Sequence, residues 1–285
     1  MNMHTSVHTV FRLALALWLA LVALLALQWS LHLLPTWAVL SLLVLLSMPV
    51  WWFRYEYDRR RRQAVLNALL RDDAALYRLL RGRPWLLLKN GVMALATMAV
   101  VLAALAAGLP LYYWLVFFLW VPIWVALYPS IGQAVGAQVR PLHAPFVLAR
   151  TQGLLSAAVL VVLLLVIGFF EPMADLRGLA LEEVLAQPGL APEALNSLLL
   201  THLAEAWALL DTLRVWMVHN MTSEAANRGV VLLAWLVALV QKSLIVFPLV
   251  LLLQAVQVLL SSEAVAADRR ETRAATTEGD SHDNP

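Results

Sequence analysis

Residues 154–170 of the chain read LLSAAVLVVLLLVIGFF, seventeen residues without a charged side chain. As an α-helix with a rise of about 1.5 Å per residue, this stretch is about 26 Å long. The hydrocarbon core of a membrane is roughly 30 Å thick, and spans of about 17–25 residues cross it. The stretch therefore predicts a transmembrane helix.

Five further blocks of the same character occur along the chain, at residues 11–34, 37–53, 91–108, 111–128 and 230–260. Of all 285 residues, 62% are hydrophobic and 13% are charged, with a mean hydropathy of +0.78. Soluble domains are about 45–50% apolar and about 25% charged, so this composition excludes a water-soluble globular enzyme. We expect an all-α integral membrane protein, a bundle of six transmembrane helices with amphipathic helices on both sides.

The basic residues are distributed unevenly among the segments that join these blocks. The links at 35–36 and 108–110 are uncharged, whereas residues 54–90 carry ten of the twenty lysines and arginines. Cytoplasmic segments of membrane proteins are enriched in these residues. Placing both termini in the cytoplasm puts sixteen basic residues inside and three outside, in the acidic segment 171–229. The Leu-, Ala- and Arg-rich usage suggests a bacterial inner (plasma) membrane.

The cytoplasmic segment 54–84 is predicted to be amphipathic, because leucines recur at helical spacing between residues 63 and 80. It begins with a run of four arginines, Arg59, Arg60, Arg61 and Arg62. Basic runs beside a span are attracted to anionic lipid headgroups, so we expect these side chains to contact such lipids. The alternative is that the segment docks a cytoplasmic partner.

Two other segments lie outside the blocks. In the outer segment 171–229, a helix is predicted from Pro192 to about His219, with leucines along one face. The end of the chain, residues 261–285, loses its apolar residues abruptly. Such a segment buries too little apolar surface to offset its chain entropy, which predicts a disordered cytoplasmic tail.

The candidate polar site inside the membrane is Gln241-Lys242-Ser243, within the last apolar block. An ionisable residue in a transmembrane helix is costly to insert and is a functional candidate for that reason. Pro248 follows closely. Because proline has no N–H, the carbonyl of Leu244 loses its helical partner and the helix tends to kink there.

An alternative placement of Lys242 remains open. The last block has 31 residues, about 46 Å as a helix, so it tilts, kinks or extends beyond the bilayer. If the true span begins near Lys242, the ammonium lies at the interface and its long stem reaches water. The predicted spans contain no Asp or Glu. Asp211 and Glu205 could approach Lys242 only if the outer helix folds onto the bundle.

Small residues recur every fourth position in two places, which predicts close helix packing. Ala99, Ala103 and Ala107 form such a stripe on the third block, and Gly132 and Gly136 repeat the spacing after the fourth.

No catalytic motif is present, and the chain has no cysteine. The histidines do not share a depth, so no metal or other cofactor is predicted. The arginines do not alternate with aromatic residues as in a nucleic-acid surface, so no nucleic-acid partner is expected. We expect a non-catalytic multi-pass inner-membrane subunit or scaffold of a larger complex, of the secretion, transfer or envelope type. Its partners would be the lipid bilayer and other membrane subunits or further copies of itself. The alternative is a transporter or channel component with its polar site on the kinked last helix.

Overall fold

The computed structural model of the chain describes residues 3–69, 83–139, 144–168, 170, 176, 178–185, 195–223 and 228–280. These residues form helices and connecting turns, without a strand among them. In chain order the helices are α1 (Met3–Ser30), the short 3-10 helix η1 (Leu31–Leu33), α2 (Thr36–Leu69), α4 (Arg83–Ala106), α5 (Leu111–Gly136), α6 (Ala144–Gly168), α7 (Leu181–Leu185), α8 (Leu198–Ser223) and α9 (Arg228–Asp280).

Six of these helices are long and apolar enough to cross a membrane, which confirms the predicted number. They are α1, α2, α4, α5, α6 and, over Trp235–Leu260, α9. Several extend beyond the predicted limits: α2 continues to Leu69, α5 continues to Gly136 and α6 begins at Ala144. The predicted limits fell where apolar residues give way to polar ones. Backbone hydrogen bonding continues past that point, because polar side chains do not interrupt a helix.

α9 is the central helix of the bundle. It packs against α6, α8, α2, α4 and α1. In the most apolar stretch of α9, 61% of the residues are buried, against 22–44% in the corresponding stretches of the other five long helices. α1 packs chiefly on α5 and α9. The core therefore forms around α9, and its largest fully buried side chains include Leu17 of α1, Trp114 and Trp124 of α5, and Leu249 of α9.

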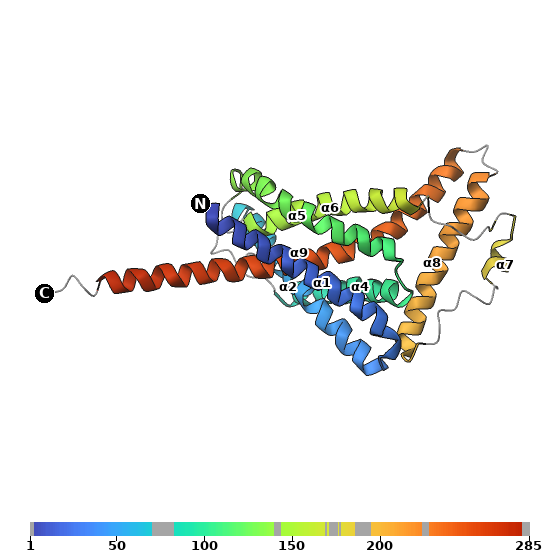
Figure 1. The fold of residues 1–285 in the computed structure, drawn as a ribbon, viewed down its shortest axis with the longest axis horizontal. Helices are drawn as coiled ribbons and strands as arrows, with labels where there is room; N and C mark the ends of the chain where they lie inside the picture. Colours follow the sequence, from blue (N-terminus) through green and yellow to red (C-terminus); the bar gives the residue numbers. More distant parts are fainter. Residues whose placement is uncertain are drawn as a thin grey trace.

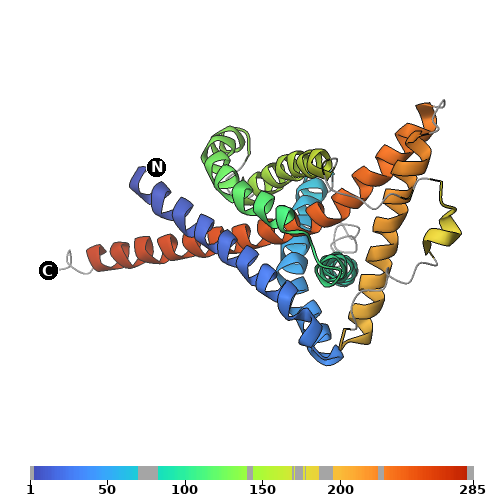
Figure 2. The same cartoon turned by 45° about the vertical axis from the view of Figure 1, so that its right-hand side comes forward.

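The two ends of the bundle differ in what lies across them. The start of α1 and the end of α9 lie at the same end in both views, and we call this the terminal end (Figures 1 and 2). α8 runs across the opposite end, the α8 end, where it packs against α9 and α4 (Figure 1). The short helix α7 rests on α8, and the Trp216 indole N–H of α8 donates a hydrogen bond of 2.9 Å to the Leu179 carbonyl just before α7.

The predicted segments outside the spans are described only in part. Residues 54–69 of the amphipathic segment continue α2 as helix, and residues 70–82 lie outside the described residues. The predicted outer helix is present as α8, which begins at Leu198; its predicted start at Pro192 lies outside the described residues.

A disordered tail is expected for residues 261–285, of which residues 281–285 lie outside the described residues. α9 continues as helix to Asp280 and projects from the terminal end of the bundle (Figure 1). The segment is rich in Ala, Glu and Arg, which favour helix. Because it extends an existing helix, it also avoids the cost of nucleation.

Candidate functional site

Lys242 is buried near the α8 end of the bundle, with 3% of the residue exposed. Its Nζ donates a hydrogen bond to the Tyr113 hydroxyl and lies 4.8 Å from the centroid of the same ring. Tyr113 is the third residue of α5, and Gly168, the last residue of α6, lies beside the lysine stem. A Cβ on Gly168 would be 3.5 Å from Lys242 Cε. Lys242 therefore lies level with the ends of α5 and α6, away from the middle of the bundle.

α8 brings an acidic side chain to this position. The Gln241 Nε2 donates a hydrogen bond of 2.7 Å to Asp211 Oδ1 of α8, and Asp211 also forms an ion pair of 2.9 Å with Arg214. The side chain of Arg214 is 6% exposed. α8 thus folds onto the bundle, which is the arrangement that the sequence analysis required for Asp211 to approach Lys242.

These side chains line one cavity of about 250 Å³ at the α8 end. Its described lining includes two basic residues, Lys242 and Arg214, and one acid, Asp211. A cavity lined by charged side chains at this depth suits water or a small ion. Ala107, from the predicted small-residue stripe, also lines this cavity.

The other two residues of the predicted polar site lie elsewhere. Ser243 follows Gln241 by two positions, about 200° around a helix, so the two side chains face different ways. The Ser243 hydroxyl donates to the Leu239 carbonyl at 2.7 Å, and Ser243 and Pro248 line a second cavity of about 630 Å³. α9 remains helical through Pro248. The structure therefore divides the predicted cluster between two cavities on different faces of α9.

Sequence reasoning missed a buried network of amides nearer the terminal end. The Trp124 indole N–H of α5 donates to Gln257 Oε1 of α9 at 3.0 Å, and Gln257 Nε2 donates to Gln152 Oε1 of α6 at 3.0 Å. Gln152 Nε2 returns a hydrogen bond to the Trp124 carbonyl. These three residues are 0–1% exposed. The network joins three helices through polar groups that satisfy one another.

A second glutamine of α9 makes a contact that only glycine permits. Gln254 Nε2 donates to the Ala149 carbonyl of α6 at 3.0 Å and passes directly over Gly153. A Cβ on Gly153 would lie 1.3 Å from that nitrogen. The spacing of Gln254 and Gln257, three residues apart on an apolar helix, is the signal by which a shared buried face could have been found.

The predicted small-residue positions differ in how tightly they pack. Ala103 is 7% exposed and Ala107 packs against the core. Ala99 is half-buried. A Cβ on Gly132 would lie 3.7 Å from Leu148 Cδ2 of α6, whereas the same atom on Gly136 would have no neighbour within 4 Å.

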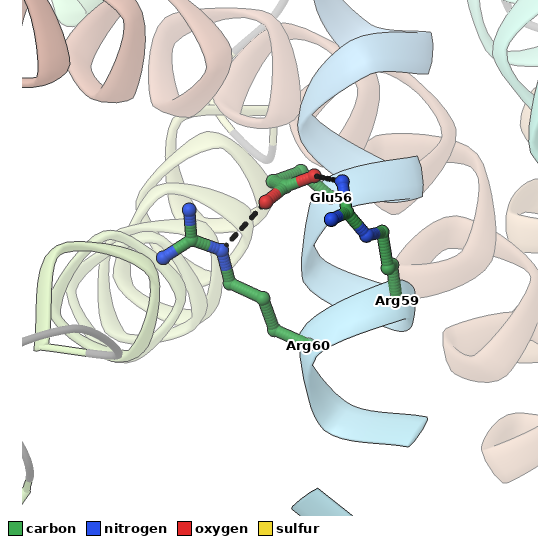
Figure 3. A network of polar contacts seen from close by, with 3 residues as sticks. All are labelled: Glu56, Arg59 and Arg60. Atoms are coloured by element: carbon green, nitrogen blue, oxygen red, sulfur yellow. Dashed lines mark hydrogen bonds and ion pairs between the residues drawn. The ribbon is translucent and has the colours of Figure 1, made fainter. Parts of the chain in front are cut away.

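The four arginines predicted to contact lipid lie on the continuation of α2. Two of them bond to one acid: Glu56 accepts from Arg59 at 3.2 Å and from Arg60 at 2.8 Å (Figure 3). The Arg60 guanidinium also lies 4.3 Å from the centroid of the Phe146 ring of α6. Arg61 is exposed and Arg62 is half-buried. Part of the run therefore contributes to packing within the chain.

Comparisons with known proteins do not add to these observations. Comparison with protein-family models, with curated proteins and with solved structures gives no match. Any function must therefore be argued from the contacts of this chain itself.

Proposed function

We propose that the chain is a non-catalytic multi-pass subunit, or scaffold, of a larger complex in a bacterial inner membrane. In the proposed orientation the terminal end is cytoplasmic, because it carries most of the basic residues, and the α8 end faces outward. The partners are other membrane subunits or further copies of this chain, besides the surrounding lipid.

The observation that carries this proposal is the hydrogen-bonded network that joins α5, α6 and α9 in the core. A conduit needs polar groups that are free to exchange partners along a path across the membrane. Trp124, Gln152 and Gln257 instead satisfy one another across α5, α6 and α9. A fully satisfied buried network stiffens and specifies a packing arrangement, which is what a structural subunit requires.

The extension of α9 also supports an assembly role. Residues 261–280 project as a helix from the terminal end, beyond the other helices (Figure 1). The segment is polar in sequence and would be reachable by a partner on the cytoplasmic side.

A second candidate function, a transporter or channel component, is favoured by the cavity around Lys242. That cavity of about 250 Å³ places a buried cation beside the acid of a separate helix. Intramembrane ionisable residues commonly mark the paths of ions. Because the described lining of this cavity has two basic residues and one acid, anions are the ions to test.

One experiment separates the two candidates. The purified chain and its Lys242→Leu variant are reconstituted into liposomes, and the flux of chloride and of inorganic phosphate is measured. Native mass spectrometry in mild detergent reports whether each protein still assembles. The subunit proposal predicts no flux above empty vesicles for either protein, with assembly intact in both.

The matched control is Lys89→Leu, which removes a half-exposed lysine at the opposite end of the bundle. Flux in the unmodified chain that is retained by Lys89→Leu and lost in Lys242→Leu would contradict the subunit proposal and favour transport.

A further inference from the structure

The geometry points to a phospholipid site in the cavity of about 630 Å³ that runs along α9: one acyl chain lies in an apolar groove and an anionic headgroup lies against two arginines. The groove is formed by α9 with α2, α4 and α6. Its apolar walls include Phe53, Met93, Val100, Leu154, Phe247 and Leu251. This inference does not depend on the proposed function.

The hydroxyl groups beside the apolar part of the groove donate hydrogen bonds to backbone carbonyls of their own helices. The Thr97 hydroxyl donates to the Met93 carbonyl at 2.6 Å, and the Ser243 hydroxyl donates to the Leu239 carbonyl at 2.7 Å. The groove wall therefore presents mainly hydrocarbon to an occupant.

The length of the groove suits an acyl chain. Its lining on α9 extends from Val240 to Gln254, fourteen residue steps, or about 21 Å of helix. One leaflet of the hydrocarbon core is about 15 Å thick, half of the roughly 30 Å total. A single chain that enters at headgroup level would therefore be covered along its whole depth.

The charged residues of the lining gather where the groove approaches the terminal end. Arg54 of α2 and Arg150 of α6 form no ion pair within the described part of the chain, and Arg54 Nε is buried there without a hydrogen-bond partner. The Arg150 guanidinium lies 4.6 Å from the centroid of the Tyr57 ring. Asp58, the acid of this lining, is already bonded to Lys89 at 3.4 Å. The charge left to complement is positive, which selects an anionic headgroup.

The size of the groove suits a single lipid acyl chain. The volume is within the roughly 300–1,000 Å³ that small-molecule sites occupy.

The test uses the full-length chain reconstituted with phosphatidylglycerol or phosphatidylcholine that carry identical palmitoyl and oleoyl chains. Native mass spectrometry after extraction counts the lipids that each protein retains. The unmodified chain is expected to retain phosphatidylglycerol in preference to phosphatidylcholine. Arg54→Gln and Arg150→Gln should each reduce that retention by a factor of about five, and the double variant by about twentyfold or more.

Two further variants separate a specific site from general attraction. Arg61→Gln removes an exposed arginine of the same helix that does not line the groove, and it should leave retention within about twofold. Ala96→Trp places an indole in the groove from an exposed position, and it should reduce retention of both lipids.

Three results would overturn the site: equal retention of the two lipids by the unmodified chain, unchanged retention in Ala96→Trp, or losses in Arg61→Gln as large as those in the groove variants. Displacement of a polypeptide by Ala96→Trp without a change in bound lipid would also overturn it, and would assign the groove to a partner helix. If the double variant does not fold, the two single variants decide.

Discussion

Gly153→Ala is expected to lower the free energy of unfolding by about 2 kcal/mol. The new Cβ would lie 1.3 Å from Gln254 Nε2 and 2.3 Å from its Cδ, so the amide must leave the position in which it bonds to Ala149. Gln254 is 6% exposed and, together with Gly153, lines the groove of about 630 Å³, so the displaced amide turns toward that groove and loses the Ala149 carbonyl as its acceptor. Reversible unfolding in mixed detergent micelles measures the change.

The same substitution at Gly136 is the matched control. Gly136 also lies in a long helix, but a Cβ there would meet nothing within 4 Å, so Gly136→Ala should be neutral or stabilise by up to about 1 kcal/mol. Gln254→Ala added to Gly153→Ala removes the clash and should recover part of the loss. Equal effects at the two glycines, or no recovery in the double variant, would show that Gln254 does not lie over Gly153.

Gln257→Leu is expected to destabilise the protein by about 1–3 kcal/mol, because it removes one partner from each of two buried hydrogen bonds. The Trp124 indole N–H loses its acceptor, and Gln152 Oε1 loses its donor. Leucine is close to glutamine in size, so the loss reports polar pairing more than volume. The measurement is the unfolding free energy, as for Gly153.

Gln133→Leu provides the control, since Gln133 is exposed on α5 and its replacement should change stability by no more than about 0.5 kcal/mol. A double-mutant cycle with Gln152→Leu should give a coupling of about 0.5–2 kcal/mol, the range found for interhelical hydrogen bonds in membranes. Strict additivity would mean that the two amides do not interact.

The long helices could be predicted because a run such as residues 154–170 has few alternatives. Seventeen apolar residues without a charge suit a membrane or a buried core, and six such blocks in one chain exceed what one soluble core can cover. The helix ends were less predictable. Gln152 falls two residues before the predicted start of its span, although α6 begins at Ala144.

The contacts of the candidate site depend on which helices are neighbours, and periodicity does not contain that information. Asp211 and Gln241 are 30 positions apart and meet only because α8 lies across the end of the bundle. Their meeting depends on the direction in which the chain turns between α8 and α9. The sequence therefore indicated which residues were costly to bury, but not which partners they would have.

The buried glutamines were missed for a different reason. Mean hydropathy averages over about twenty residues, so a single amide such as Gln257 lowers the value of an apolar block only slightly. Its importance comes from the indole of Trp124 on another helix, 133 positions away. Spacing placed Gln254 and Gln257 on one face, but the neighbour that this face meets required the fold.

The proposed function requires the α8 end to face outward and the terminal end to face the cytoplasm. The chain contains no cysteine, so a single introduced thiol is unambiguous. His202→Cys places the thiol on α8, where the native side chain is 67% exposed. Gln133→Cys places it at an exposed position of α5 near the terminal end.

The direct measurement is labelling of these two variants in spheroplasts of a bacterial host with a membrane-impermeant maleimide. The proposed orientation predicts that His202→Cys is labelled in intact spheroplasts, whereas Gln133→Cys is labelled only after the membrane is permeabilised. Protection of His202→Cys together with labelling of Gln133→Cys in intact spheroplasts would contradict it.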